Sequence, residues 1–291
     1  MANTVIQYVS LGFTGLFTGL IYALMAIGLS VVFGVTRIVN FAHGEMLVLA
    51  AFIAIYLHKS LGIDPLLLIP LVSIIMFGVG YFLQKWMINR LLNRSEHSQF
   101  LALAAMAIIL LNLQQIIFGS EAQAIVTSYS LQSIEIWGVL FDTVRLLTGA
   151  IAFIVIFLLL SFFYYTHHGK AIRACADNLL GAQIIGLNYR KLYAFSFAVA
   201  AACLGVAGTL LSLVIDVTPH TAPQLTLLSF IIVILGGLGS MVSALIGGIL
   251  IGVIESYAAF FVQGSLKSLF SFLILILILL IRPQGLLAKK Q

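Results

Sequence analysis

The chain has 291 residues, of which 62% are hydrophobic and only 8% are charged, and its formal net charge is +5. Soluble domains carry roughly 25% charged residues, so the composition excludes a soluble domain and predicts an all-α, polytopic membrane protein. The net positive charge does not indicate nucleic-acid binding, because Lys and Arg in membrane proteins mark the cytoplasmic side of the bilayer.

A membrane-spanning helix needs about 20 mostly apolar residues. On that basis we expect eight or nine membrane segments in a single transmembrane domain over 1–291, because two of the nine candidates are short enough to be broken or re-entrant. The nine candidates are 5–33, 38–57, 66–88, 100–118, 144–165, 192–214, 225–239, 241–262 and 268–281. The first is long, and Gly28 and Gly34 offer places for it to bend.

The second segment contains the most informative motif. Its purely apolar part, 46–57, is too short to cross the bilayer, so it must include 38–45, which carries Asn40, His43 and Glu45. A polar group that faces hydrocarbon costs several kcal/mol, so these side chains must face a cavity, another helix or the bilayer edge. Polar, glycine-broken backbone at membrane depth is typical of a solute pathway.

The two longest polar connections are 119–143 and 166–191. The first contains Trp137 and suits an interfacial cap. Interpreted as one helix, the second places an apolar stripe on one face and an Arg173–Asp177 ion pair on another. The predicted stripe consists of Ile172, Ala176, Leu180, Ile184 and Leu187. Such a helix can lie on the bilayer or insert into a groove of a partner protein, and its mixed charges favour the groove.

The seventh segment is also short and ends at Gly236, Gly237 and Gly239. Two short glycine-bounded segments in the two halves of a chain are typical of a transport site, although each could be an ordinary helix with a glycine cap. Glu255 is the other acidic residue within a span, and we expect it to face another helix or a dimer interface. We therefore predict that these residues line or gate a pathway: Asn40, His43, Glu45, Gly236, Gly237, Gly239 and Glu255.

Small residues recur at helical spacing in the first and eighth segments. They are Gly15, Gly19 and Ala23, and Ala244, Gly247, Gly248 and Gly252. Such ladders let helices pack closely in membranes, so packing explains both.

The basic residues predict the sidedness. If the N-terminus lies outside, nine spans place eleven Lys and Arg residues on one side and only three, Lys59, Arg145 and Lys267, on the other. The positive-inside rule makes the first side cytoplasmic, with the C-terminus on it. The eleven are Arg37, Lys85, Arg90, Arg94, Lys170, Arg173, Arg190, Lys191, Arg282, Lys289 and Lys290.

Four blocks of the sequence, in order, resemble one family. They are 28–45, which contains the polar motif, 169–188, 235–240 and 282–286. These blocks are similar to those of permeases of ATP-binding-cassette importers for branched-chain and other hydrophobic amino acids. The likeness covers nearly the whole chain and is specific for the family but only weakly for the solute, which could also be urea, a short amide or an aromatic acid.

The resemblance implies a second homologous permease subunit, two cytoplasmic ATPase subunits, a periplasmic solute-binding protein and a place in the bacterial inner membrane. It also implies that 166–191 is the loop that an ATPase grips, and that the permease itself needs no cofactor. The coupling residues that it implies are Gly169, Arg173, Ala174, Asp177, Ala182, Gly186 and Asn188. The chain has no P-loop motif, so if ATP drives transport, another chain must bind it.

Two other classes of function remain open. His43 and Glu45 could relay protons in a stand-alone secondary transporter, since His titrates near neutral pH. In the alternative that we favour, Asn40 and His43 hydrogen-bond the broken backbone while Glu45 pairs with Arg37. An intramembrane enzyme is the third class, but no paired nucleophile and base stands at membrane depth, and no residue group has the spacing of a metal site.

Overall fold

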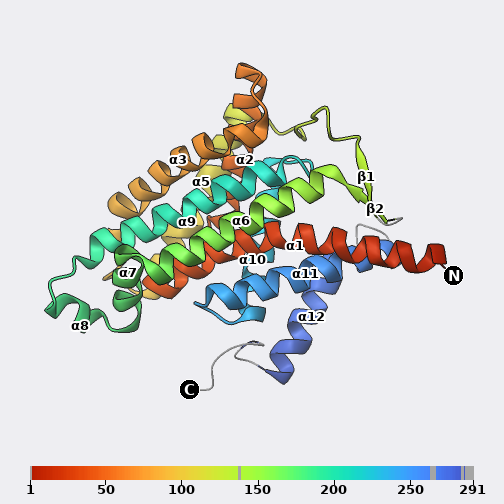
Figure 1. Ribbon diagram of the computed structural model, residues 1–291. Helices are drawn as coiled ribbons and strands as arrows, with labels where there is room; N and C mark the ends of the chain where they lie inside the picture. Colours follow the sequence, from red (N-terminus) through yellow and green to blue (C-terminus); the bar gives the residue numbers. More distant parts are fainter. Residues whose placement is uncertain (1, 137–138, 263–266, 283–284, 286–291) are drawn as a thin grey trace.

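The computed structural model describes residues 2–136, 139–262, 267–282 and 285, and the chain is helical almost throughout (Figure 1). Trp137, the C-terminal lysines and most of the block 282–286 lie outside the described residues. The elements are α1 (Ala2–Thr36), α2 (His43–Leu61), α3 (Pro65–Leu83), η1 (Gln84–Ile88), α4 (Asn89–Leu91), α5 (Glu96–Phe118), β1 (Ser133–Ile136), β2 (Val139–Asp142), α6 (Thr143–Tyr165), α7 (His167–Asp177), α8 (Leu179–Ile184), α9 (Tyr189–Leu211), η2 (Pro219–Thr221), α10 (Ala222–Gly236), α11 (Met241–Phe261) and α12 (Lys267–Ile281).

The predicted all-α membrane fold is confirmed. Eight helices in the described chain are long and apolar enough to cross a bilayer, and Leu269–Ile281 forms a shorter apolar helix. α1 continues as one helix past Gly28 and Gly34, so neither glycine breaks it. The sequence did not predict the antiparallel hairpin of β1 and β2, in which Ser133 faces Asp142.

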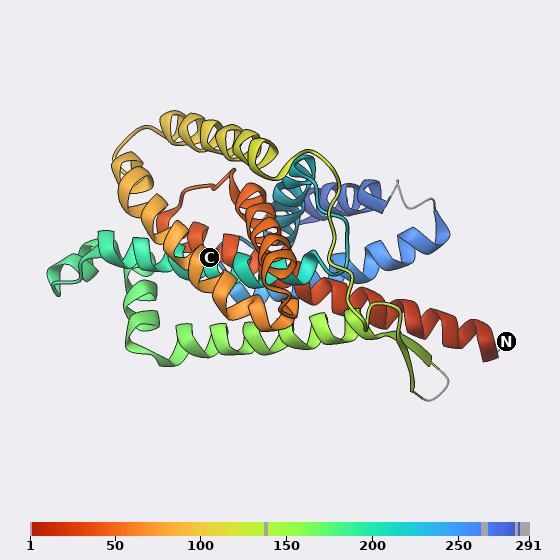
Figure 2. The same ribbon diagram turned by 90° about the horizontal axis from the view of Figure 1, so that it is seen from above.

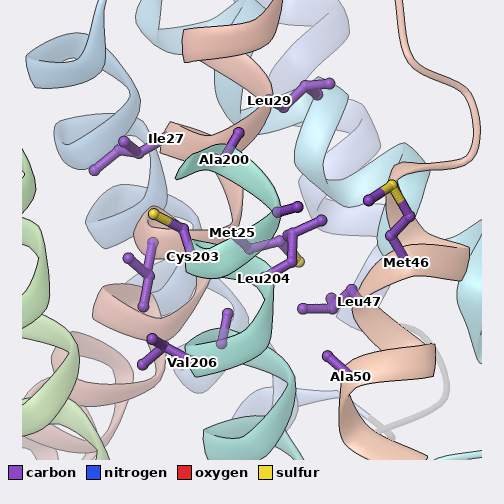
Figure 3. Packing of buried hydrophobic residues seen from close by; sticks show 14 of the residues in the cluster. Met25, Ile27, Leu29, Met46, Leu47, Ala50, Ala200, Cys203, Leu204 and Val206 are labelled. Carbon is purple, nitrogen blue, oxygen red and sulfur yellow. The ribbon is translucent and has the colours of Figure 1, made fainter. Parts of the chain in front are cut away.

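α9 lies at the centre of the bundle, between α1 on one side and α2 and α3 on the other (Figures 1 and 2). Its small residues let its neighbours approach closely: a Cβ at Gly205 would lie 2.8 Å from Ser73 Cα, and one at Gly208 would lie 2.5 Å from Leu47 O. In Figure 3 its side chains lie among those of α1 and α2, with Leu204 near Met25. A helix that is apolar on every side is expected in such a buried position.

The two predicted small-residue ladders pack against each other and join α1 to α11. A Cβ at Gly248 would lie 2.5 Å from Ala23 Cα, and one at Gly19 would lie 2.8 Å from Ile249 Cα. Gly252 is in equally close contact with Gly19. The prediction that packing explains these glycines is therefore confirmed, and the seam brings the two halves of the chain together.

The bundle has two distinct ends. At the hairpin end, Lys59 Nζ donates to Gln123 Oε1 (2.9 Å), and Ser10 Oγ donates to Leu140 O (3.0 Å). At the α7/α8 end, Asn89 Nδ2 donates to Arg190 O (3.4 Å), which brings two basic helix junctions together. Figure 1 shows α8 at this end, far from the N-terminus and the hairpin.

The α1–α11 seam predicts how the fold responds to one added methyl group. Gly252→Ala should lower the apparent Tm of the purified protein, because overpacking typically costs about 1–3 kcal/mol. Gly78→Ala on α3 is the matched control, since a Cβ there meets nothing within 4 Å. Equal shifts in the thermal unfolding of the two variants would contradict the close contact at the seam.

Candidate functional site

The chain turns back into the bundle between α1 and α2. α1 ends at Thr36, Arg37 adopts a positive φ of 57°, and α2 begins only at His43. His43 Nε2 lies 3.0 Å from the carbonyl oxygen of Met25, which is eleven residues before the end of α1. At 1.5 Å per residue, α2 therefore begins about 16 Å inside the end of α1.

The first turn of α2 is in close contact with the first turns of α10. The backbone N–H of Gly44 donates to Thr226 Oγ1 (2.8 Å), and a side chain on Gly44 would collide with Ala222 O. The Thr226 hydroxyl lies 3.4 Å from Glu45 Oε2, and Gln114 Nε2 of α5 donates to Glu45 O (2.9 Å). Two helix N-termini and α5 thus meet within the bundle.

The structure supports the hydrogen-bonding role of Asn40 and His43. Asn40 Oδ1 accepts a hydrogen bond from the N–H of Ala42 (3.1 Å), and both side chains are buried. The predicted pairing of Glu45 with Arg37 is wrong. Glu45 is 3% exposed and takes part in no ion pair in the described chain; its carboxylate faces Thr226, because α2 begins deep inside the bundle while Arg37 remains at the end of α1.

The predicted glycine segment lies at the opposite end of α10 from this contact. Gly236 ends the helix, and Gly237 and Gly239 adopt positive φ angles of 116° and 81°. A Cβ on Gly34 would lie 3.3 Å from Gly239 Cα, so the segment packs against the last turns of α1. The structure therefore does not bring these glycines together with Asn40, His43 and Glu45.

An apolar pocket of about 290 Å³ lies between the two predicted groups. It is bounded by the last turns of α1, the connection to α2 and the second half of α10. The lining residues are Leu29, Phe33, Val39, Phe41, Phe230, Val233, Ile234 and Leu238. A pocket of this chemistry can accept an aliphatic or aromatic side chain but offers no partner to a charged group.

Glu255 belongs to neither group. Its carboxylate accepts hydrogen bonds from Tyr22 of α1 (3.0 Å) and Ser271 of α12 (3.0 Å), and it is 6% exposed. The expectation that it faces another helix is confirmed, and its bonds tie α11 to two neighbours.

The loop 166–191 is not the single helix that the sequence predicted. Asn178 adopts extended backbone (φ −147°, ψ 97°) and separates α7 from α8, while its side chain caps α8 by accepting from Gly181 N. The predicted apolar stripe is consequently wrong, because the break rotates α8 relative to α7. Ile172 is fully buried, whereas Leu180 and Ile184 are 72% and 86% exposed.

The predicted coupling residues divide into structural and exposed positions. Arg173 does not pair with Asp177, contrary to prediction; its Nε donates to Phe163 O (3.1 Å), and its guanidinium lies 4.9 Å from the Tyr164 ring centroid. It thus caps the carbonyl end of α6, where a cation is favourable. Gly169 packs against Phe163, where a side chain does not fit.

The other coupling residues follow the same division. Ala182 is buried and Asn188 caps α9 by accepting from Lys191 N, while Ala174 is half-buried. Asp177 and Gly186 are exposed, the latter with a φ of 85°.

Sequence reasoning missed Thr226 and Gln114, which hold the first turn of α2. Each is a polar residue within an apolar segment, and that isolation is the one signal the sequence offers. It also missed that the exposed apolar residues of the loop gather at α8, where Leu180, Ile184 and Ile185 are all more than two-thirds exposed.

Comparison with known proteins decides the family. The family model described as the permease component of the branched-chain amino acid transport system matches residues 12–279. The chain belongs to this permease family. It is 29% identical to the high-affinity branched-chain amino acid transport system permease protein LivH of Salmonella typhimurium, over 100% of this chain and 99% of LivH. It is 31% identical to the corresponding protein BraD of Pseudomonas aeruginosa, over 95% and 94% of the two chains.

A solved structure supports the fold of the family member. A chain in the structure of PsaBC from Streptococcus pneumoniae in complex with Fab aligns with a TM-score of 0.51 at 13% identity, covering 93% of this permease and 91% of that chain. At this identity the likeness extends to the arrangement of the helices and no further.

The Thr226 contact yields a prediction about stability. Thr226→Val should lower the apparent Tm in detergent, because it leaves the buried N–H of Gly44 without a partner at a cost of about 1–3 kcal/mol. Ser229→Ala is the matched control on the same helix, since the buried Ser229 hydroxyl donates only to Leu225 O of its own helix (2.8 Å). A shift for Thr226→Val no larger than that for Ser229→Ala would refute the role of this contact.

Proposed function

We propose that this family member is the membrane-spanning permease subunit of an ATP-driven importer for branched-chain or other hydrophobic amino acids. The family match over residues 12–279 carries the proposal. The broken second span supports it, because half-helices that begin inside the bundle are typical of transport sites. In this role the chain catalyses no reaction itself and binds no cofactor; separate ATPase subunits hydrolyse ATP.

The apolar pocket beside the break supports a hydrophobic solute. Its 290 Å³ and its lining of aliphatic and aromatic side chains suit a leucine-like side chain. Urea, short amides and aromatic acids remain alternatives within the same architecture, and of these the pocket chemistry disfavours urea, which has no apolar part to bury.

In the proposed orientation, the α7/α8 end lies in the cytoplasm of a bacterial cell and the hairpin end faces the periplasm. The basic junctions around Arg90 and Arg190 lie together at the α7/α8 end, which agrees with the positive-inside rule. The N-terminus is then outside. A solute-binding protein would dock at the hairpin end, and a second permease subunit would complete the pathway within the bilayer.

The proton-coupled alternative gains no support from the contacts of its two proposed residues. His43 bonds to Met25 and Glu45 to Thr226, and they share no hydrogen bond in the described chain. A proton relay needs a chain of hydrogen bonds between its groups, so the structural role of both residues explains more of what is observed.

Reconstitution into proteoliposomes distinguishes the ATP-driven importer from the proton-coupled carrier. In proteoliposomes that hold the permeases and ATPases, leucine uptake should require both ATP and a loaded binding protein. It should vanish when a hydrolysis-deficient ATPase replaces the normal one. Uptake driven by a pH gradient without ATPases, and abolished by Glu45→Gln, would overturn the importer and establish the proton-coupled carrier.

The exposed tip of α8 is the feature through which we propose that the ATPase acts. Leu180, Ile184 and Ile185 form an apolar surface at the α7/α8 end, where α8 projects from the bundle (Figures 1 and 2). Large apolar side chains exposed on a short helix fit a groove of a partner protein. α7 anchors this tip, because Arg173 fixes it to the end of α6. Movement of the tip would therefore be passed directly to a membrane span.

This arrangement predicts a selective effect of charge on α8. Ile184→Asp should weaken retention of the ATPase by about 2 kcal/mol, roughly thirtyfold, because it places a charge in an apolar contact. Leu131→Asp is the control, since Leu131 is an equally apolar and 96% exposed residue at the hairpin end. Co-purification of the ATPase with each variant measures the effect, and equal retention would exclude α8 from the contact.

A further inference from the structure

One face of the bundle differs from the rest of its membrane surface. The exposed residues of α3 and α11 are all apolar, and those of α6 are apolar apart from two tyrosines at its α7 end. By contrast, four polar side chains stand among exposed apolar residues such as Leu113 and Leu227 on the surface where α5 meets η2 and α10. We call this the α5–α10 polar face; it consists of Asn112, Gln115, His220 and Gln224, of which Gln115 is half-buried and the others are exposed.

The polar face lies at membrane depth, close to the break in the second span. Gln114, next to Gln115, donates to Glu45 O at the first turn of α2. Gln224 stands two residues before Thr226, which holds Gly44. Asn112 is six residues from the end of α5 at Phe118, or about 9 Å along the helix axis. Asn112, Gln115 and Gln224 therefore stand within apolar helices, and His220 lies in the short turn η2 that precedes α10.

Most of the hydrogen-bonding capacity of the face is unused. The Gln115 side-chain nitrogen lies 2.8 Å from His220 Nε2, and Asn112 Nδ2 donates to Ile108 O of its own helix (2.7 Å). The amide oxygens of Asn112 and Gln115 point to no partner, and Gln224 makes no hydrogen bond within the described chain. Lipid cannot supply partners for these groups, so the face must meet water, solute or another polypeptide.

We propose that the α5–α10 polar face is a wall of the solute passage, and that its side chains hydrogen-bond the polar head of a zwitterionic solute as it crosses. This inference rests on the proposed transport function and adds the surface and the chemistry. Side-chain amides suit such a head, because they accept from an ammonium group and donate to a carboxylate. None of the four side chains carries a permanent charge that would hold the solute too tightly to release it.

Three aromatic residues pack together on the α7/α8 side of the polar face. The Phe41 ring lies 4.7 Å from the Phe100 ring and 5.5 Å from the Phe230 ring, centroid to centroid. These three residues join the connection before α2 to α5 and α10. The proposed wall thus carries the four polar side chains on the hairpin side and an aromatic cluster on the other.

Cysteine accessibility tests the inference in the full transporter in native membranes. Gln115→Cys and Gln224→Cys should react with a membrane-impermeant, charged methanethiosulfonate about tenfold faster than Ile154→Cys and Ile246→Cys, because thiols form the reactive thiolate in water and not in lipid. The two controls replace apolar residues exposed on α6 and α11. The parent chain gives a low background, since Cys175 and Cys203 are both buried and burial raises the pKa of the Cys175 thiol.

Protection of the introduced cysteines from labelling by bound solute then distinguishes a surface that binds solute from one that only contacts water. A saturating solute that the same preparation takes up should slow the labelling of Gln115→Cys and Gln224→Cys severalfold. Labelling as slow as that of the two controls would overturn the inference, and so would fast labelling without protection. If the preparation shows no ATP-dependent uptake, the proposed function fails instead, and the labelling contrast still reports on the face.

Discussion

The packing of Gly44 against the first turns of α10 is the contact on which the rest of the site depends. Backbone groups inside a bilayer must find partners within the protein, because hydrocarbon offers none. α2 begins far inside the bundle, so its first N–H groups need acceptors there, and Thr226 Oγ1 supplies one at 2.8 Å. The contact requires glycine, since a side chain at position 44 would collide with Ala222 O. Specific contacts with α10 therefore stabilise the break in the second span.

The helices at the break are joined differently from α1 and α11. α2 is linked to α10 by a polar contact and to α5 by the bond from Gln114, whereas α1 is joined to α11 by a continuous seam of small residues. Small residues let two helices pack closely along their length, while buried hydrogen bonds fix the ends of helices that meet inside the bundle. The helices around the break are packed closely as well: a Cβ at Gly208 would lie 2.5 Å from Leu47 O of α2, and one at Gly247 would lie 2.6 Å from Ile232 O of α10.

The sequence predicted the spans and the buried polar motif because both follow from local chemistry. Nine apolar segments became helices, although the second begins at His43 and not at residue 38, and the shortage of apolar residues in 46–57 placed Asn40 and Glu45 inside the bundle. The sequence failed where a long-range contact decides the outcome. Glu45 faces Thr226, 181 residues away, instead of nearby Arg37. Arg173 binds the carbonyl end of α6 instead of Asp177, because an unsatisfied helix terminus competes successfully with an exposed ion pair.

The residue types in the loop 166–191 also did not reveal that its two helices have different structural roles. Helical periodicity assigned Ile172 and Ile184 to one stripe, but the extended backbone at Asn178 lets the first anchor α7 while the second projects from α8. An anchored helix followed by a projecting apolar tip can transmit force, whereas one uniform amphipathic helix lying on the bilayer would dissipate it in lipid. The break that the periodicity concealed is therefore what makes the loop suitable for coupling. The family resemblance pointed to this loop as the proposed coupling region, but only the backbone shows that α7 is anchored and α8 projects.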